Sequence, residues 1–279
     1  MSSLSFATRL LTAVLVLLAS ATVSAQSLPV AVDVSGETAT VRVGSAASPI
    51  AGLTLTFDDA SGLTAASLGV SAQLVSLGNP ALLSRLPSAQ LTQLDAAFPL
   101  LVTVEPPAGG GLGFVRTVRV EVHTHALEYS AGSAYRLFKA PLGGNFTDIT
   151  DEIAPGSVRA RGTTGGFSQF LVLADLRQSD VVVAQKFASL RAIVATLPAA
   201  ERPPLTASLD SAEAAVAAED FVAANNAIDA FRAQVSARAG QGIAQTWQAG
   251  GALANPAGQL LAGSATLKFS IAYLRDYGL

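Results

Sequence analysis

Two different spacings of apolar residues divide the chain near Arg177. From Leu28 to Leu173 apolar and polar positions tend to alternate, and glycine or proline interrupts them at short intervals. This two-residue period is typical of strands in an antiparallel sheet. After Arg177 the period changes to three or four residues, which is the spacing of one helix face. The sequence therefore predicts an α+β protein in two domains, an antiparallel β-sandwich over 26–176 and a small C-terminal α-helical bundle over 177–279.

The strand pattern is clearest in two segments. Val30–Val34 alternates, Ser35-Gly36-Glu37 offers a turn, and Thr38–Val43 continues as a return strand. Phe114–Thr124 places valines on one face and charged or polar residues on the other. We therefore expect a sheet with one buried face and one face in water.

Further apolar runs predict the remaining strands of this part. These runs are Leu53–Phe57, Leu100–Val104, Tyr135–Lys139, Ser157–Arg161 and Phe167–Leu173. Two segments with bounding prolines, Pro80–Leu86 and Gln90–Ala97, are expected to be short helical or irregular crossings. The glycine-rich run Gly109–Gly113 is expected to be a hairpin loop, because a strand pattern follows it where a phosphate site needs a helix.

Four amphipathic stripes predict four helices after Arg177. The stripes run over Val183–Leu197, Leu205–Val216, Phe221–Val235 and Leu260–Leu274. Ser179 is expected to cap the first helix, and Asn255 with Pro256 marks the start of the last one. Trp247, in the link before the last helix, is expected to cover the end of the bundle.

The first 25 residues have the pattern of a cleavable secretion signal. Arg9 supplies a positive n-region, Leu10–Ala19 an apolar core, and Val23-Ser24-Ala25 a small-x-small cleavage site. The apolar core is shorter than the roughly twenty residues that a membrane span needs. We therefore expect an exported protein, periplasmic or extracellular after cleavage near Ala25, with no membrane span in its mature form.

Composition narrows the class of function. The net charge is −3, and removal of Arg9 with the leader makes it one unit more negative. This balance gives no electrostatic reason to expect nucleic acid as a partner. The chain has no cysteine, which excludes disulfides, thiol catalysis and thiolate metal sites.

One strand carries a candidate metal site. Glu121, His123 and His125 follow one another at a spacing of two, so an extended strand projects all three to the same face. Imidazole nitrogens and a carboxylate oxygen are ligands that zinc accepts. The acidic loops at Asp58-Asp59 and at Asp148 with Asp151-Glu152 are candidates for calcium, although neither has the spacing of an EF-hand loop. The alternative to a metal site in each case is a turn or strand end whose side chains are simply solvated.

Residues in both parts carry a family resemblance. Leu205–Asp210, Asp220-Phe221 and Ile228–Phe231 resemble the FIMAH-type helical module, a spacer or accessory domain of bacterial extracellular proteins. Tyr135–Phe138, Phe146–Thr150 and Gly166–Phe170 resemble closing strands of β-sandwich modules from bacterial surface proteins. The resemblance implies an exported bacterial protein and transfers no catalytic residue.

Two functions remain open on these grounds. The first is a non-enzymatic binding, scaffolding or surface-associated module with an unknown protein or glycan partner at the cell envelope. It is favoured because no G-x-S-x-G, H-E-x-x-H or G-x-x-x-x-G-K motif occurs. The alternative is a secreted or periplasmic hydrolase, or a metal-dependent enzyme that uses the His123 and His125 strand.

Overall fold

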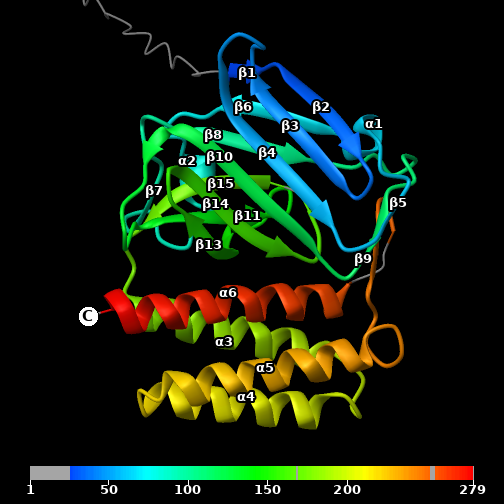
Figure 1. The fold of residues 1–279 in the computed structure, drawn as a ribbon, viewed down its shortest axis with the longest axis vertical. Helices are drawn as coiled ribbons and strands as arrows, with labels where there is room; N and C mark the ends of the chain where they lie inside the picture. The colour runs from blue at the N-terminus through cyan, green and yellow to red at the C-terminus, as the bar shows by residue number, and fades with distance from the viewer. Residues whose placement is uncertain (1–25, 168, 252–254, 279) are drawn as a thin grey trace, which may run out of the picture.

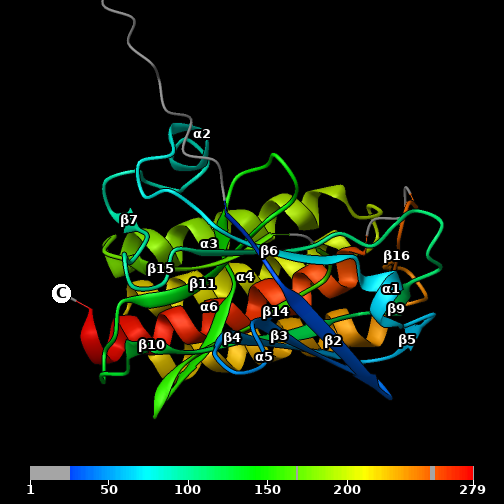
Figure 2. The ribbon, with the colours of Figure 1, turned by 90° about the horizontal axis from the view of Figure 1, so that it is seen from above.

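The computed structural model describes residues 26–167, 169–251 and 255–278 (Figure 1). The predicted leader, residues 1–25, lies outside the described residues. Strands occupy the first part of the described chain and four long helices the last part, so the predicted α+β class is confirmed. In the view from above, the strands cross over the long helices (Figure 2). No helix in the described ranges combines the length and the apolar character needed to cross a bilayer.

The described strands form three sheets in which all pairings between strands are antiparallel. The first sheet contains β1 (Gln26–Leu28), β6 (Val70–Leu74), β8 (Leu100–Val104), β15 (Gln169–Asp175), β11 (Tyr135–Ala140) and β12 (Thr147–Asp148) in that order, with β7 (Thr92–Gln93) paired to β15. The second contains β13 (Thr150–Ala154), β14 (Ser157–Thr164), β10 (Val118–Glu128), β4 (Pro49–Phe57), β3 (Thr38–Gly44) and β2 (Val30–Ser35). The third, small sheet contains β16 (Thr246–Gln248), β9 (Gly113–Val115) and β5 (Ala60–Ser61).

The inner faces of the two large sheets share one hydrophobic core. Val41, Leu55 and Val120 enter it from the second sheet, and Leu100 and Val172 enter it from the first. The outer face of the first sheet packs against residues 75–94, which include the short helix α2 (Pro80–Leu83). The outer face of the second sheet carries charged and polar side chains, as the alternation along β10 predicts.

The expected hairpin between β2 and β3 is confirmed. Ser35 pairs with Thr38, and Gly36 turns the chain with a φ of 56°, in the left-handed region that favours glycine. A second glycine of this kind, Gly69 with φ 59°, ends the short helix α1 (Ala65–Leu68).

The four long helices lie beneath the sheets in two layers (Figure 1). Their bounds are α3 (Ser179–Thr196), α4 (Arg202–Ala217), α5 (Phe221–Arg238) and α6 (Pro256–Tyr277). Helices α3 and α6 form the layer next to the strands, and α6 contacts β13 and β14. The predicted apolar stripes form a second hydrophobic core that contains helical and loop residues from this part of the chain. Asn255 caps α6 by accepting a hydrogen bond from the Gly258 amide, as predicted.

Several local expectations are wrong. Residue Gln178, not Ser179, precedes the first turn of α3, and its side chain makes no capping hydrogen bond. Phe114–Thr124 is not one strand, because Arg116 adopts a φ of 58° and divides it into β9 and β10, which lie in different sheets. The glycine-rich loop therefore joins β8 to β9 across two sheets and is not a hairpin loop. The segment Gln90–Ala97 includes the short strand β7.

The link between α5 and α6 returns to the sheets. Its strand β16 pairs with β9, so residues from both sides of the expected boundary at Arg177 build the small third sheet. Trp247 stacks on Phe114 with ring centroids 5.1 Å apart and meets Phe167 edge to face at 5.3 Å. The expectation that Trp247 covers the end of the helices is wrong, because its ring packs against the core of the sheets.

Candidate functional site

A cavity of about 480 Å³ lies where α3 and α6 meet the ends of β11, β12 and β14. Its volume is within the range of small-molecule sites. Its apolar walls include Phe146, Leu190, Ile193 and Ala262. Exposed residues form its rim, namely Pro87, Thr147, Gln185, Ser189, Ala192 and Gln259. The cavity therefore lies between the sheets and the helices and opens to solvent on the side of α3.

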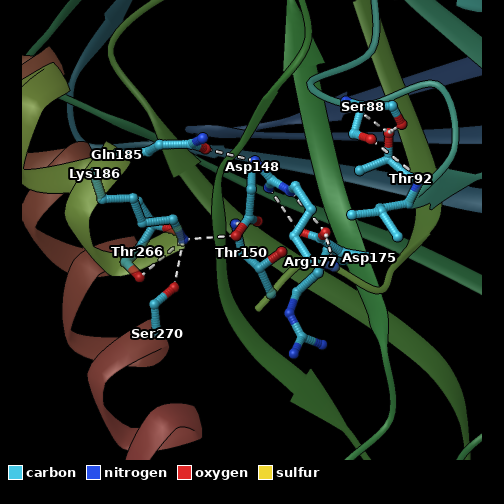
Figure 3. A network of polar contacts seen from close by, with 12 residues as sticks. Ser88, Thr92, Asp148, Thr150, Asp175, Arg177, Gln185, Lys186, Thr266 and Ser270 are labelled. Atoms are coloured by element: carbon cyan, nitrogen blue, oxygen red, sulfur yellow. Dashed lines mark hydrogen bonds and ion pairs between the residues drawn. The ribbon is translucent and has the colours of Figure 1, made fainter. Parts of the chain in front are cut away.

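A buried ion pair forms one wall of this cavity (Figure 3). Lys186 of α3 donates from Nζ to Asp148 Oδ2 at 2.6 Å. The same ammonium group donates to Ser270 Oγ at 2.7 Å and to the hydroxyl and carbonyl oxygens of Thr266. Asp148 ends β12, whereas Thr266 and Ser270 lie one turn apart on α6. One lysine thus ties the first sheet to two helices.

Local structure explains why these groups meet. Lys186 lies three residues after Val183 and four before Leu190, so it shares the buried face of α3 with them. Burial by itself raises the pKa of Asp148, but the charge of Lys186 and hydrogen bonds from Lys186 and Thr150 outweigh it and lower this pKa. Asp148 is therefore held ionised, and Lys186 is its counterion.

A second ion pair lies at the entry to α3. Arg177 donates from Nε to Asp175 Oδ1 at 2.8 Å and from Nη2 to Asp175 Oδ2 at 2.7 Å, which is the bidentate geometry. Its remaining terminal nitrogen donates to Gln185 Oε1 at 2.7 Å. Both charged side chains are more than nine-tenths buried. The charge of Arg177 is therefore satisfied inside the protein (Figure 3).

Lys139 of β11 differs from these two cations. It lines the cavity, and its Nζ makes no hydrogen bond or ion pair with any residue in the described ranges. Burial lowers its pKa to about 8. A methyl group built on Gly166 would lie 3.9 Å from Lys139 Nζ and 3.4 Å from Trp247 Nε1. The Lys139 amine and one edge of the Trp247 ring therefore both lie close to Gly166.

The sequence-predicted metal residues do lie together on the outer face of the second sheet. The rings of His123 and His125 are 4.7 Å apart between centroids. Glu121, however, forms ion pairs with Arg161 and, at 3.2 Å, with Arg159. The part of the chain that the structure describes contains no group of three or more histidine, aspartate or glutamate side chains placed to hold a metal ion.

The environment of His123 also bears on zinc binding. Its Nε2 lies 2.6 Å from Ser157 Oγ, at hydrogen-bonding distance. Burial, the charge of Arg159 and the neighbouring His125 lower the pKa of His123, which favours the neutral ring that a metal needs. Zinc binding by this strand stays a prediction, and its two histidines are better placed for it than Glu121.

Protein contacts engage Asp58, Asp148 and one carboxylate oxygen of Asp151. Asp58 accepts hydrogen bonds from the amide and hydroxyl of Thr117 and lies 3.7 Å from Arg116. Asp148 is bound to Lys186, and Asp151 accepts from the hydroxyl of Thr163. Calcium binding at either loop also stays a prediction.

Sequence reasoning singled out Asp148 of the cavity lining but missed Lys139, Lys186 and Thr266, and also Ser270, which accepts from Lys186. Lys139, Lys186, Thr266 and Ser270 belong to no motif, and the chain has only three lysines, at 139, 186 and 268. One signal was present, because Lys186 interrupts the apolar stripe of its helix. A charge on a buried helix face calls for an internal partner.

Comparison with curated proteins and with solved structures found no match. A family model does match, over residues 13–275, and its description is a family of unknown function, DUF6689. The match extends across the sheets, the cavity and the long helices. The chain therefore belongs to the DUF6689 family.

Proposed function

We propose that this chain is a non-enzymatic exported binding protein that holds a small molecule between a β-sandwich and a helical bundle. The cavity at the junction carries the proposal, because it combines about 480 Å³ of volume with apolar walls and a few oriented polar groups. The two large sheets around one core support the sandwich assignment, and the separate helical core supports the bundle. The leader pattern supports export.

The two ion pairs of the cavity favour binding over catalysis. Lys186 and Arg177 are each engaged by a carboxylate and by further acceptors. A general base or nucleophile needs a partner within hydrogen-bond reach and a reacting atom beside both. Groups already committed to one another stabilise the junction and position a ligand. The resemblances to the FIMAH-type module and to bacterial surface modules agree with this role.

A substitution at the rim tests the proposal. Ala192 is exposed and lines the cavity, so Ala192→Trp should place an indole over the mouth. Ala184 is an exposed alanine of the same helix outside the lining, so Ala184→Trp is the matched control. The probe is N-phenyl-1-naphthylamine, a neutral dye whose fluorescence rises in apolar sites.

We expect saturable binding of one dye per chain to the wild type and to Ala184→Trp. The Ala192→Trp variant should bind at least about tenfold more weakly, which is a change of about 1.4 kcal/mol. Equal binding to both variants would show that the dye does not enter this cavity, and no binding to the wild type would refute a small-molecule site.

A further inference from the structure

We infer that the cavity selects amphipathic monocarboxylates, with the carboxylate beside Lys139 and the apolar part against the walls from α3 and α6. This inference rests on the proposed binding function and adds the chemical class of the ligand. Three observations carry it: the charge balance of the lining, the position of the Lys139 amine, and the apolar character of the remaining walls.

The charge balance leaves one uncompensated cation. Four charged residues line the cavity: Lys139, Asp148, Arg177 and Lys186. Asp148 neutralises Lys186, and Asp175 neutralises Arg177. Lys139 has no such carboxylate among the described residues. Lys139 is half-buried, so its ammonium group loses part of its hydration, and a bound carboxylate offsets that cost.

Lys139 is placed to meet a carboxylate inside the cavity. Its amine belongs to a residue of the cavity lining, next to the lining residue Thr147 of β12. A carboxylate accepts hydrogen bonds on both oxygens, whereas a hydroxyl offers a single oxygen. The ammonium group of Lys139 therefore matches a carboxylate, which adds charge attraction to the hydrogen bond.

Other head groups fit this charge balance less well. A phosphate monoester carries about −1.5 to −2 charges at pH 7, so it would place excess negative charge near Asp148. An amine would add a second cation beside Lys139. An alcohol would leave the lysine charge uncompensated. A single negative charge is the match, and the walls of Phe146, Leu190, Ile193 and Ala262 suit an alkyl or aryl body.

Binding should also change the protonation of Lys139. Its pKa of about 8 means that most of the amine is neutral at pH 9. A carboxylate nearby favours the charged form, so a bound carboxylate raises this pKa and the complex takes up a proton. Proton uptake is therefore a signature that a purely apolar binding mode does not produce.

The test is isothermal titration calorimetry of the full chain with octanoate, octanol, octylamine and octyl phosphate. We expect octanoate to bind the wild type about ten- to a hundredfold more tightly than octanol, as one charge-assisted contact allows. Lys139→Met should reduce octanoate affinity to that of octanol and leave octanol affinity unchanged. Lys268→Met is the matched control, because Lys268 is paired with Asp229 outside the cavity and its loss should change neither affinity.

A second measurement needs no variant. Titration of octanoate at pH 9 in buffers of different ionisation enthalpy should show net proton uptake by the wild type. Equal affinities for octanoate and octanol, or tighter binding of octyl phosphate or octylamine, would overturn the monocarboxylate inference and leave the binding function standing. Absence of binding by all four ligands, together with absence of dye binding, would overturn the proposed function itself.

Discussion

The Lys186 and Asp148 pair allows a quantitative test of how the helices are attached to the sheets. The two side chains are 10% and 2% exposed, and their charged atoms are 2.6 Å apart. Removing one member of a buried pair costs about 3 to 5 kcal/mol, because the remaining charge loses its partner in a medium of low polarity. Replacing both members by groups of similar size is often nearly neutral.

The structure predicts which of the two single variants loses more stability. Lys186→Met leaves the Asp148 carboxylate with the backbone amide of Thr150 and no counterion, so we expect a loss near 4 to 5 kcal/mol in unfolding free energy. Asp148→Asn leaves Lys186 three oxygen acceptors on Thr266 and Ser270, so the loss should be smaller, about 3 kcal/mol. The double variant should lose less than about 2 kcal/mol, which makes the coupling energy large.

Urea unfolding followed by far-ultraviolet circular dichroism measures the unfolding free energy of the wild type, the two single variants and the double variant, which together form a double-mutant cycle. A double variant whose loss equals the sum of the two single losses would refute the reasoning, because it would mean that the two charges do not stabilise each other. Separate transitions for strands and helices in the wild type would show that the pair does not couple their unfolding.

The pH dependence of the same cycle has a definite sign. The Asp148 pKa lies below its unfolded value of about 3.9, so the unfolded chain binds this proton more readily. The stability from the pair is therefore present above about pH 4 and is lost as pH falls through the lower, folded pKa. We expect the difference between the wild type and the double variant to shrink in that range. An unchanged difference down to about pH 2 would contradict the assigned shift.

The remaining predictions concern three other sites. Burial lowers the pKa of Lys139 from 10.5 to about 8, so the unfolded chain binds more protons between these two pH values and wild-type stability should rise with pH across that window. The Lys139→Met variant should lack this rise and, without ligand, should be about 1 to 3 kcal/mol more stable than the wild type at pH 7. The same pH dependence of the urea-unfolding free energy in both proteins would disprove this prediction. If His123 and His125 bind zinc, titration of zinc into the wild type should release more heat than titration into a His123→Ala, His125→Ala double variant, and equal heats would end the metal hypothesis. Trp247→Ala should cost about 3 kcal/mol through its lost contacts with the aromatic rings, whereas Trp247→Phe should cost about 1 kcal/mol, and equal losses would mean that ring packing does not matter there.

Local patterns determined the elements of this protein. Alternation along β10 buries Val118, Val120 and Val122, because successive side chains of a strand face opposite sides. The apolar stripe of α6 is buried because residues three and four positions apart share one face of a helix. Asn255 caps α6 because its side chain accepts a hydrogen bond from the amide three residues ahead. These features depend on neighbours within a few residues, so the sequence alone was enough to predict them.

Short strands were harder to predict because long-range pairing defines them. β16 has three residues and no alternating run long enough to recognise, and it exists as a strand because β9 lies beside it. Trp247, the middle residue of β16, packs against the core of the sheets because this pairing brings it there. A partner distant in sequence decides such elements, and their composition does not reveal it.

The candidate site was decided by tertiary structure. Asp148 and Lys186 are 38 positions apart, and Thr266 is 80 positions beyond Lys186. The sequence indicated that Lys186 shares an apolar face, but not which oxygen atoms that face would meet. Lys139 stood out only in the tertiary structure, where Arg177 and Lys186 each pair with a carboxylate and Lys139 pairs with none among the described residues. Periodicity determines which side of an element is buried, whereas the packing of sheets on helices determines which charges are neutralised there.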